Sequence, residues 1–381
     1  ILSFLLFFTS WLCGAPRIVE FSAAGQGVVQ DDGDDFPDWL EILHEDEESY
    51  SLTDHYLTND PDALSLWKIP RGTTLKSGQR WVVYASGKDR TNIFQNAVHS
   101  NFTLEKSRGY LALVAPDGEK ILSEWRDYPS QRPGISYGED DGGGIGYFAE
   151  MTPGEGNGVA FAEKVADTKF SVRRGFYEDP IMLTIATATE GAAIYVTLDG
   201  SEPSVSLRNH YTDAIPISST TIVRAMAVKA GQLSTNIDTH SYLFVESVLT
   251  QPENPDGFPN RWGPVSADYG FDRSVGSDDD LKSALLDYPS VSLVMPIDSW
   301  FGRSTEGGVG GIYANSTRKG LDWEKVVSAE FLNFEGSINA QVDCGIRVYG
   351  NASRQTSRPK HNLRLAFRAR YGPSKLNFPV F

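Results

Sequence analysis

The sequence predicts a mainly β protein assembled from sandwich modules, and three observations support this. Short apolar or alternating runs, such as Trp81–Ala85 and Leu111–Val114, recur along the chain. The chain contains 36 Gly and 20 Pro, the residues that form tight turns between short strands. Long helical periods do not interrupt these runs. Regularly spaced strands of this kind are typical of β-sandwiches.

Length and charge restrict the organisation of the chain. Its 381 residues exceed one ordinary domain, so we expect two or three. The formal net charge of −16 argues against nucleic acid as a partner, because phosphate is repelled. Only Cys344 follows the first 15 residues, so we expect no intramolecular disulfide and a buried thiol within an apolar core.

Residues 1–15 are apolar and end in the small residues Gly14 and Ala15. This run has the length of a signal peptide and is too short to span a bilayer. We therefore expect a protein that is secreted or held at the cell surface, with a signal that lacks its first residues. The alternative is a buried first strand. A second apolar stretch of transmembrane length is absent from the sequence, so we expect no transmembrane span.

Residues 17–138 carry an ordered series of motifs. These are Ile18–Ser22, Asp38–Ile42, Ala85–Asp89, His99–Phe102 and Tyr110–Leu113. The series, with Thr152–Gly154 and Asn157 after it, resembles a bacterial lamin-tail domain. The resemblance implies an immunoglobulin-like sandwich that serves interaction and not catalysis. Residues 139–168 are rich in glycine, and we expect a linker there.

Residues 169–246 form a second predicted β-module. Tyr195–Pro203, together with Gly175–Tyr177 and Val223–Ala225, resembles the chitobiase/β-hexosaminidase C-terminal domain. That resemblance implies a small immunoglobulin-like sandwich appended to other domains. Asp199-Gly200 within it predicts a tight turn with a positive φ. Residues 247–287 are rich in Pro, Gly, Asp and Asn, and we expect a second linker.

The last segment, residues 288–381, ends in a strongly basic stretch. From Gly345 onward there are eight Lys or Arg and no Asp or Glu. Phosphate is a natural partner for such a segment, because Arg and Lys offer charge-assisted donors. The candidates for phosphate or nucleotide contacts are Lys360, Arg354, Asn351 and Ser353. The alternative is a basic strand face that pairs with acidic modules.

Three parts of this segment resemble the N-terminal part of the spore-coat-protein-H (CotH) kinase-like family. They are Gly350–Arg354, Pro359–Leu365 and Arg370–Pro379. The resemblance implies an incomplete α+β kinase-like N-lobe, with ATP and Mg²⁺ as cofactors of the intact protein. Phosphoryl transfer needs carboxylates that hold Mg²⁺, and Asp343 is the last acidic residue. We therefore assign no catalytic residue and no cofactor to this chain.

An acidic run gives the candidate metal ligands Asp31, Asp32, Asp34 and Asp35, which surround Gly33. Clustered carboxylates on a loop are able to hold Ca²⁺, but the spacing differs from that of an EF-hand. The alternative is a solvated loop.

The resemblances together imply a bacterial, planctomycete-type exported surface protein of several modules, whose intact form carries a CotH-like kinase domain. The chain itself is expected to act through binding modules without catalysis, with surface proteins or polysaccharides as partners. Two alternatives remain open. One is a purely adhesive or structural cell-surface protein, and the other is a carbohydrate-binding accessory protein.

Overall fold

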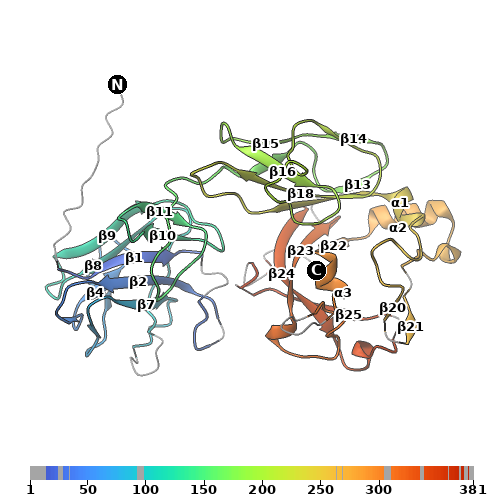
Figure 1. Cartoon of the computed structure of the whole chain (residues 1–381). Coiled ribbons are helices and arrows are strands. Elements are labelled where there is room, and N and C mark those ends of the chain that lie inside the picture. Colours follow the sequence, from blue (N-terminus) through green and yellow to red (C-terminus); the bar gives the residue numbers. More distant parts are fainter. Residues whose placement is uncertain are drawn as a thin grey trace. The chain divides into compact units, whose positions relative to one another are not determined.

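The computed structural model describes residues 14–24, 29–33, 35–91, 98–262, 264–267, 269–303, 310–334, 339–358, 360–368, 370–372 and 376. Most of the predicted signal segment, and Asp34, lie outside these residues. The prediction of a mainly β fold is confirmed. The chain divides into two compact units, residues 1–163 and 164–381 (Figure 1). Within the described residues, helices are too short and too polar to cross a membrane.

The first unit contains two antiparallel sheets. The first has the order β11-β10-β1-β2-β7, with β1 Arg17–Ser22, β2 Asp38–His44, β7 Gln79–Ala85, β10 Ser136–Glu139 and β11 Ile145–Phe148. The second has the order β5-β4-β8-β9, with β4 Tyr56–Thr58, β5 Trp67–Lys68, β8 Gly109–Val114 and β9 Ile121–Tyr128. A separate pair joins β3 Tyr50–Ser51 to β6 Thr74–Leu75.

A sandwich-like core lies between these two sheets. Ile18 and Phe21 of β1 pack there against Trp125 and Tyr128 of β9. Strict alternation would place Ile18 and Phe21 on opposite faces of the strand, because they are three residues apart. The register shifts between Ile18 and Glu20, and this irregularity resets the alternation so that both side chains face the core.

The outer face of the first sheet is closed by residues 152–157. Glu20 of β1 and Glu41 of β2 lie directly opposite each other, and both are fully buried. Glu20 accepts hydrogen bonds from the backbone N and hydroxyl of Thr152, at 3.2 and 3.1 Å, and Glu41 accepts from the backbone N of Gly154 at 2.5 Å. Asn157 donates to the carbonyl of residue 19 at 3.1 Å. The closing segment is therefore fastened by two buried carboxylates.

The glycine-rich segment after residue 139 takes part in the first unit. Strand β11 pairs with β10, and Asp140 caps the turn between them by accepting from Gly142 and Gly144 at 2.9 and 2.7 Å. Tyr147 and Phe161 exchange two backbone hydrogen bonds of 2.8 Å. Residues 145–148 thus form a strand, and Phe161 bridges to it, within a region where the sequence predicts a linker.

The second unit begins with a four-stranded sheet in the order β13-β19-β18-β16. Its strands are β13 Gly175–Tyr177, β16 Ala193–Thr197, β18 Thr221–Val228 and β19 Asp238–Phe244. Two strand pairs lie against it, β12 Thr168–Phe170 with β15 Ile185–Thr187, and β14 Ile181–Leu183 with β17 Ile215–Ile217. Leu183 and Ile217 from the pairs meet Val223 and Tyr242 from the sheet in one apolar core.

One helix lies in the region 247–287, where the sequence predicts a second linker, and another reaches into it from Val245. They are α1 Val245–Leu249 and α2 Asp278–Asp287, accompanied by β20 Arg261–Trp262, β21 Val265–Ser266 and the 3₁₀ turn η2 Arg273–Val275. Val245 and Leu249 of α1 pack against Leu281 of α2. Ser277 caps α2 by accepting from the backbone N of Asp280 at 3.2 Å. Part of this segment is therefore folded onto the second unit.

A second antiparallel sheet ends the chain, in the order β22-β23-β24-β25. Its strands are β22 Ser290–Val294, β23 Lys325–Leu332, β24 Ala340–Tyr349 and β25 Asn362–Ala366. The helix α3 Ile297–Phe301 and the 3₁₀ turn η3 Leu321–Trp323 lie between β22 and β23 in the chain, and the 3₁₀ turn η4 Ala352–Arg354 lies between β24 and β25. Cys344 is fully buried in its core, as predicted, and burial raises the pKa of its thiol to about 12. Four strands and one short helix do not establish a kinase-like lobe.

Glu330 of β23 joins the two sheets of the second unit. It is fully buried and accepts from the backbone N of Ser241 on β19 at 3.0 Å, and also from the Ser241 hydroxyl. The guanidinium of Arg174 lies 3.4 Å away. Burial raises the pKa of Glu330, and Arg174 and Ser241 oppose that rise. Asn339 adds a bond of 2.8 Å to the carbonyl of Arg174.

We expect Glu330→Ala to destabilise the second unit by about 3–5 kcal/mol, because it leaves Arg174 largely buried without its carboxylate. Denaturant unfolding of the full chain, followed by hydrogen exchange of β19 and β23 peptides, measures this. Asp278→Ala is the matched control, since it removes only an exposed ion pair with Arg273. Equal losses in the two variants would contradict a fastening role for Glu330.

Candidate functional site

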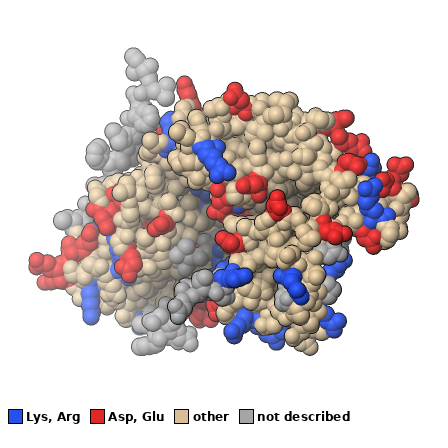
Figure 2. All heavy atoms as spheres, turned by 45° about the vertical axis from the view of Figure 1, so that its right-hand side comes forward, with Lys and Arg blue, Asp and Glu red and all other residues tan. Residues whose placement is uncertain are grey.

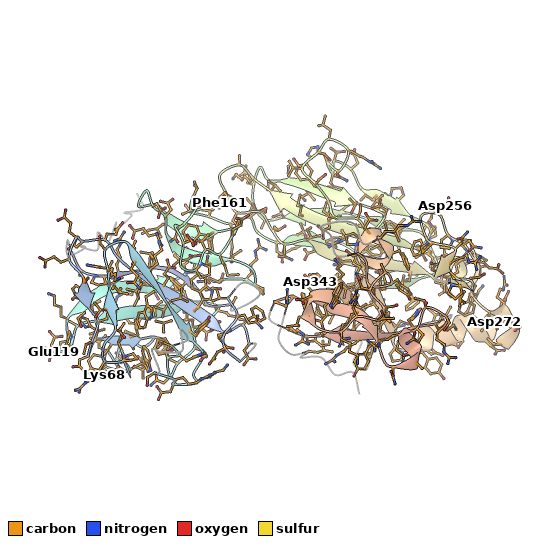
Figure 3. The ribbon with its side chains drawn as sticks, turned by 60° about the horizontal axis from the view of Figure 1, so that its bottom comes forward. Lys68, Glu119, Phe161, Asp256, Asp272 and Asp343 are labelled. Atoms are coloured by element: carbon orange, nitrogen blue, oxygen red, sulfur yellow. The ribbon has the colours of Figure 1, made fainter. Side chains whose placement is uncertain are left out.

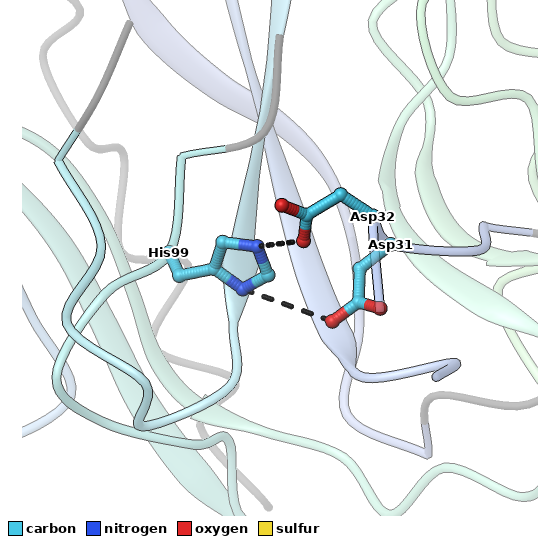
Figure 4. Close-up of side chains that lie close together, drawn as sticks. All are labelled: Asp31, Asp32 and His99. Atoms are coloured by element: carbon cyan, nitrogen blue, oxygen red, sulfur yellow. Dashed lines mark ion pairs between the residues drawn. The ribbon is translucent and has the colours of Figure 1, made fainter. Parts of the chain in front are cut away.

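The first candidate is an acidic cluster in the first unit. The loop before β2 carries Asp31 and Asp32, and the segment after β7 carries Lys88, Arg90 and, further on, His99. Figure 4 shows Asp31 and Asp32 on one side of the His99 ring, each facing a different ring nitrogen. His99 forms isolated bridges with Tyr84 and Arg90, and these fix its position beside β7.

Asp31 organises the loop. Its Oδ1 accepts from the backbone N of Gly33 and Asp35, at 2.8 and 3.0 Å, and its Oδ2 accepts from Lys88. Its side chain is fully buried, and burial alone would raise the pKa. The hydrogen bonds from Lys88, Gly33 and Asp35 outweigh burial, so the pKa of Asp31 is lowered.

Asp32 and His99 face each other. His99 Nε2 lies 3.4 Å from Asp32 Oδ1, and Arg90 donates to both oxygens of Asp32 at 2.8 Å. His99 Nδ1 is 2.9 Å from the Ser86 hydroxyl, and the ring stacks on Tyr84 at 4.9 Å. Burial, followed by the charge of Arg90, lowers the pKa of His99. Its side chain is fully buried, so the charged form of the ring is disfavoured.

The sequence did not point to His99. It lies 67 positions after Asp32, and only the pairing around β7 brings the two together. Of the four predicted calcium ligands, Asp31 and Asp35 both contact Lys88, and Asp32 contacts Arg90. The calcium hypothesis stays a prediction.

The basic C-terminal segment gives the second candidate. Arg354 is buried, and its Nη1 donates to the carbonyls of Thr317 and Arg318, at 3.1 and 3.4 Å. Ser353 donates to the carbonyl of Tyr349 at 3.0 Å. Asn351 and Lys360 are exposed. Two of the four predicted phosphate contacts thus bond to their own chain, and the phosphate assignment stays a prediction.

Other basic residues of this segment also have protein partners. Arg347 and Arg368 lie 3.4 and 3.2 Å from the carboxylate of Glu324, which is buried. Arg347 and Arg364 both lie over the ring of Tyr349, at 5.2 and 5.1 Å. On the face in Figure 2, Lys and Arg side chains gather at the lower edge of the second unit. This part of the surface is basic, and part of its charge is balanced internally.

The third candidate is a cavity of about 610 Å³ beside β16. Its wall is part polar and part apolar, and Val196, Leu198 and Ile215 supply apolar side chains. The side chains that line it include Thr197, Asp199, Ser201, Glu202, Arg208, Asn209, His210, Tyr211, Thr212 and Asp213. Three carboxylates and one guanidinium thus face a hollow of the size that holds a small ligand.

Backbone pairing along β16 builds one wall of this cavity. Val196 N donates to the carbonyl of Asn209 at 2.6 Å, and Tyr211 N donates to the carbonyl of Ile194 at 2.9 Å. Residues 209–211 therefore run along the outer edge of β16. Tyr211 is held from the other side, because its hydroxyl accepts from the backbone N of Ile185 at 3.1 Å.

A tight turn builds the other wall. Gly200 has φ +77°, as predicted for Asp199-Gly200. A Cβ at Gly200 would lie 3.3 Å from Val294 of β22, so the turn packs tightly against the C-terminal sheet. Arg224 reaches Glu202 at 3.6 Å, and Asp199 accepts from the backbone N of Ser201 at 3.0 Å.

The C-terminal sheet also places a carboxylate near this wall. Asp343 lies on β24 (Figure 3), where burial raises its pKa and the charge of Arg224 opposes that rise. Its side chain accepts from Gln341 at 3.0 Å. The charge of Arg224 thus acts on both Glu202 at the cavity and Asp343 on β24.

Comparison with known families matches residues 172–239 to the chitobiase/beta-hexosaminidase C-terminal domain. The resemblance inferred for this module is thereby confirmed, and the cavity lies inside the matched region. The match covers one module and leaves the rest of the chain unassigned. No curated protein matches the chain.

Acid is expected to destabilise the first unit through Asp31. Its pKa is lower in the folded than in the unfolded state, so the unfolded state binds more protons below about pH 4. The resulting stabilisation is present above that pH and is lost as the pH falls further. Thermal melting between pH 7 and pH 2 measures the loss, which Asp31→Asn should reduce. The exposed control Asp62→Asn should leave it unchanged, and an equal effect in both variants would contradict the assignment.

Proposed function

We propose that the chain is a non-catalytic binding protein whose chitobiase-type module holds a saccharide in the cavity beside β16. The observation that carries this proposal is the position of the cavity. It lies inside the module that matches a domain associated with carbohydrate-active enzymes, and its wall combines polar and charged side chains with apolar ones.

The wall suits a sugar, since each hydroxyl of a sugar both donates and accepts hydrogen bonds. Arg208 supplies donors, and Asp213 supplies acceptors, and both side chains are exposed at the cavity. Charged partners strengthen such bonds. His210 is exposed beside them and Tyr211 is half-buried, and their rings offer apolar faces to a sugar.

The carboxylates of the turn have structural partners. Asp199 accepts from Ser201, and Glu202 pairs with Arg224. Glycoside hydrolysis needs a proton-donating acid and a second carboxylate placed across a sugar bond. We therefore assign Asp199 and Glu202 to the shape of the cavity, which fits a binding module.

A second candidate is a structural role, in which the module braces the C-terminal sheet. The buried bonds of Glu330 with Ser241 and Arg174 favour it. The two roles predict different results for the cavity. A brace needs Glu330 and is indifferent to Arg208 and Asp213, whereas a saccharide receptor needs both of the latter.

The finer expectations extend this proposal to the intact protein. We propose that the intact protein is exported and that residues 17–138 form a lamin-tail interaction module. We also propose that residues from 288 onward begin a CotH-like kinase domain, which in the intact protein uses ATP and Mg²⁺. The sandwich-like core of the first unit supports the lamin-tail proposal. The reading frame beyond Phe381 tests the kinase proposal, and a frame without further Asp and Asn candidates for Mg²⁺ would overturn it.

We expect the full chain to be retained on insoluble chitin or peptidoglycan, and Arg208→Ala and Asp213→Ala to reduce retention at least tenfold. Each variant removes an exposed hydrogen-bonding group and leaves the core intact. Lys229→Ala, on the same module outside the cavity, is the control. Retention that is unchanged in both cavity variants, or no retention on either material, would overturn the proposal.

A further inference from the structure

The acidic cluster of the first unit has a buried ring nitrogen that its surroundings leave unsatisfied. His99 is fully buried, and its Nε2 has no hydrogen-bond partner among the described residues. Figure 4 shows this nitrogen facing a carboxylate oxygen of Asp32, 3.4 Å away. A ring nitrogen that presents its lone pair to a carboxylate oxygen is repelled by that oxygen unless a cation lies between them.

We infer that Asp31, Asp32 and His99 bind one divalent cation of the Zn²⁺ class. The tautomer that this needs fits the other side of the ring. Nδ1 lies 2.9 Å from the Ser86 hydroxyl, whose oxygen also accepts from the backbone N of Lys88. A hydrogen bond from Nδ1–H to this oxygen leaves the lone pair on Nε2. Histidines that bind metals are oriented in this way by a partner on the second nitrogen.

The distances fit a tetrahedral ion. Bonds of about 2.0–2.1 Å at tetrahedral angles place two ligand atoms about 3.3–3.5 Å apart. The observed separation between His99 Nε2 and Asp32 Oδ1 is 3.4 Å. The ligand atoms of all three side chains lie within 4.8 Å of one another. Asp31 Oδ2 lies 4.0 Å from the other ring nitrogen, Nδ1, so the Asp31 carboxylate has to turn toward Nε2 to join the set.

The charges leave room for a dication. Asp31, Asp32 and Asp35 contact Lys88 and Arg90, which leaves one net negative charge. The side chain of Arg90 is 41% exposed, so it is able to turn into solvent. With Arg90 displaced, Lys88 and one dication balance the three carboxylates. Asp32, at 35% exposure, gives the ion its route of entry.

A nitrogen ligand changes the choice of ion. Ca²⁺ takes six to eight oxygen ligands, whereas imidazole with carboxylates suits Zn²⁺ and neighbouring transition metals. The calcium hypothesis rested on carboxylates alone, and the structure adds His99 to them. The site is independent of the proposed saccharide cavity, which lies in the second unit.

Equilibrium dialysis of the metal-free full chain against Zn²⁺, with elemental analysis, tests the inference, and a parallel arm uses Ca²⁺. We expect one equivalent of Zn²⁺ with preference over Ca²⁺. His99→Gln and Asp32→Asn should weaken Zn²⁺ binding at least tenfold. His55→Gln is the matched control, since His55 is a buried histidine of the same unit that bonds to Tyr50 and Thr53.

Two further variants keep the test decisive if His99→Gln fails to fold. Ser86→Ala should weaken binding about 10–100-fold, because it frees the second ring nitrogen. Arg90→Gln should tighten binding, because it removes the competing cation. Zn²⁺ should also raise the melting temperature of the first unit in the wild type. No saturable Zn²⁺ binding, or binding that Ser86→Ala and Arg90→Gln leave unchanged, would overturn the inference.

Discussion

The second unit depends on one buried carboxylate. Glu330 is fully buried, yet it bonds to Ser241 and faces Arg174, both from the chitobiase-type module. A buried ion pair adds little net stability over an apolar contact, but breaking one partner is costly. The contacts of Glu330 therefore fix the position of the module on the C-terminal sheet more than they add to the free energy of unfolding. It makes the module and the C-terminal sheet one body.

This arrangement shapes the cavity. The turn at Gly200 packs on Val294 of β22. Arg224 pairs with Glu202 of the cavity wall and also interacts electrostatically with Asp343 on β24. One wall of the cavity therefore rests on the C-terminal sheet. A module of this type appended by a flexible tether would lack that support. Because the C-terminal sheet supports this wall, the wall loses less conformational entropy when a ligand binds.

Local chemistry made part of this architecture predictable. The positive φ of Gly200 was predictable from the tight turn at Asp199-Gly200, and the burial of Cys344 from the apolar strand around it. The buried acids were not predictable in the same way. Glu330 alternates with Ala329 and Phe331 as a solvent-facing residue would, and another module buries it. Arg354, a predicted phosphate contact, likewise bonds to carbonyls some 36 positions away, which its local sequence does not indicate. Long-range burial leaves no local signal.

Hydrogen exchange of the full chain, with and without a soluble chitin oligosaccharide, tests the central claim most directly. The account predicts slower exchange confined to residues 194–215, the strand and loop that line the cavity. It also predicts no change in the peptides of β23 and β24, which support the module without touching the ligand. Protection that falls instead on the basic segment after Gly345, or an absence of protection anywhere, would contradict the assignment of saccharide binding to this module.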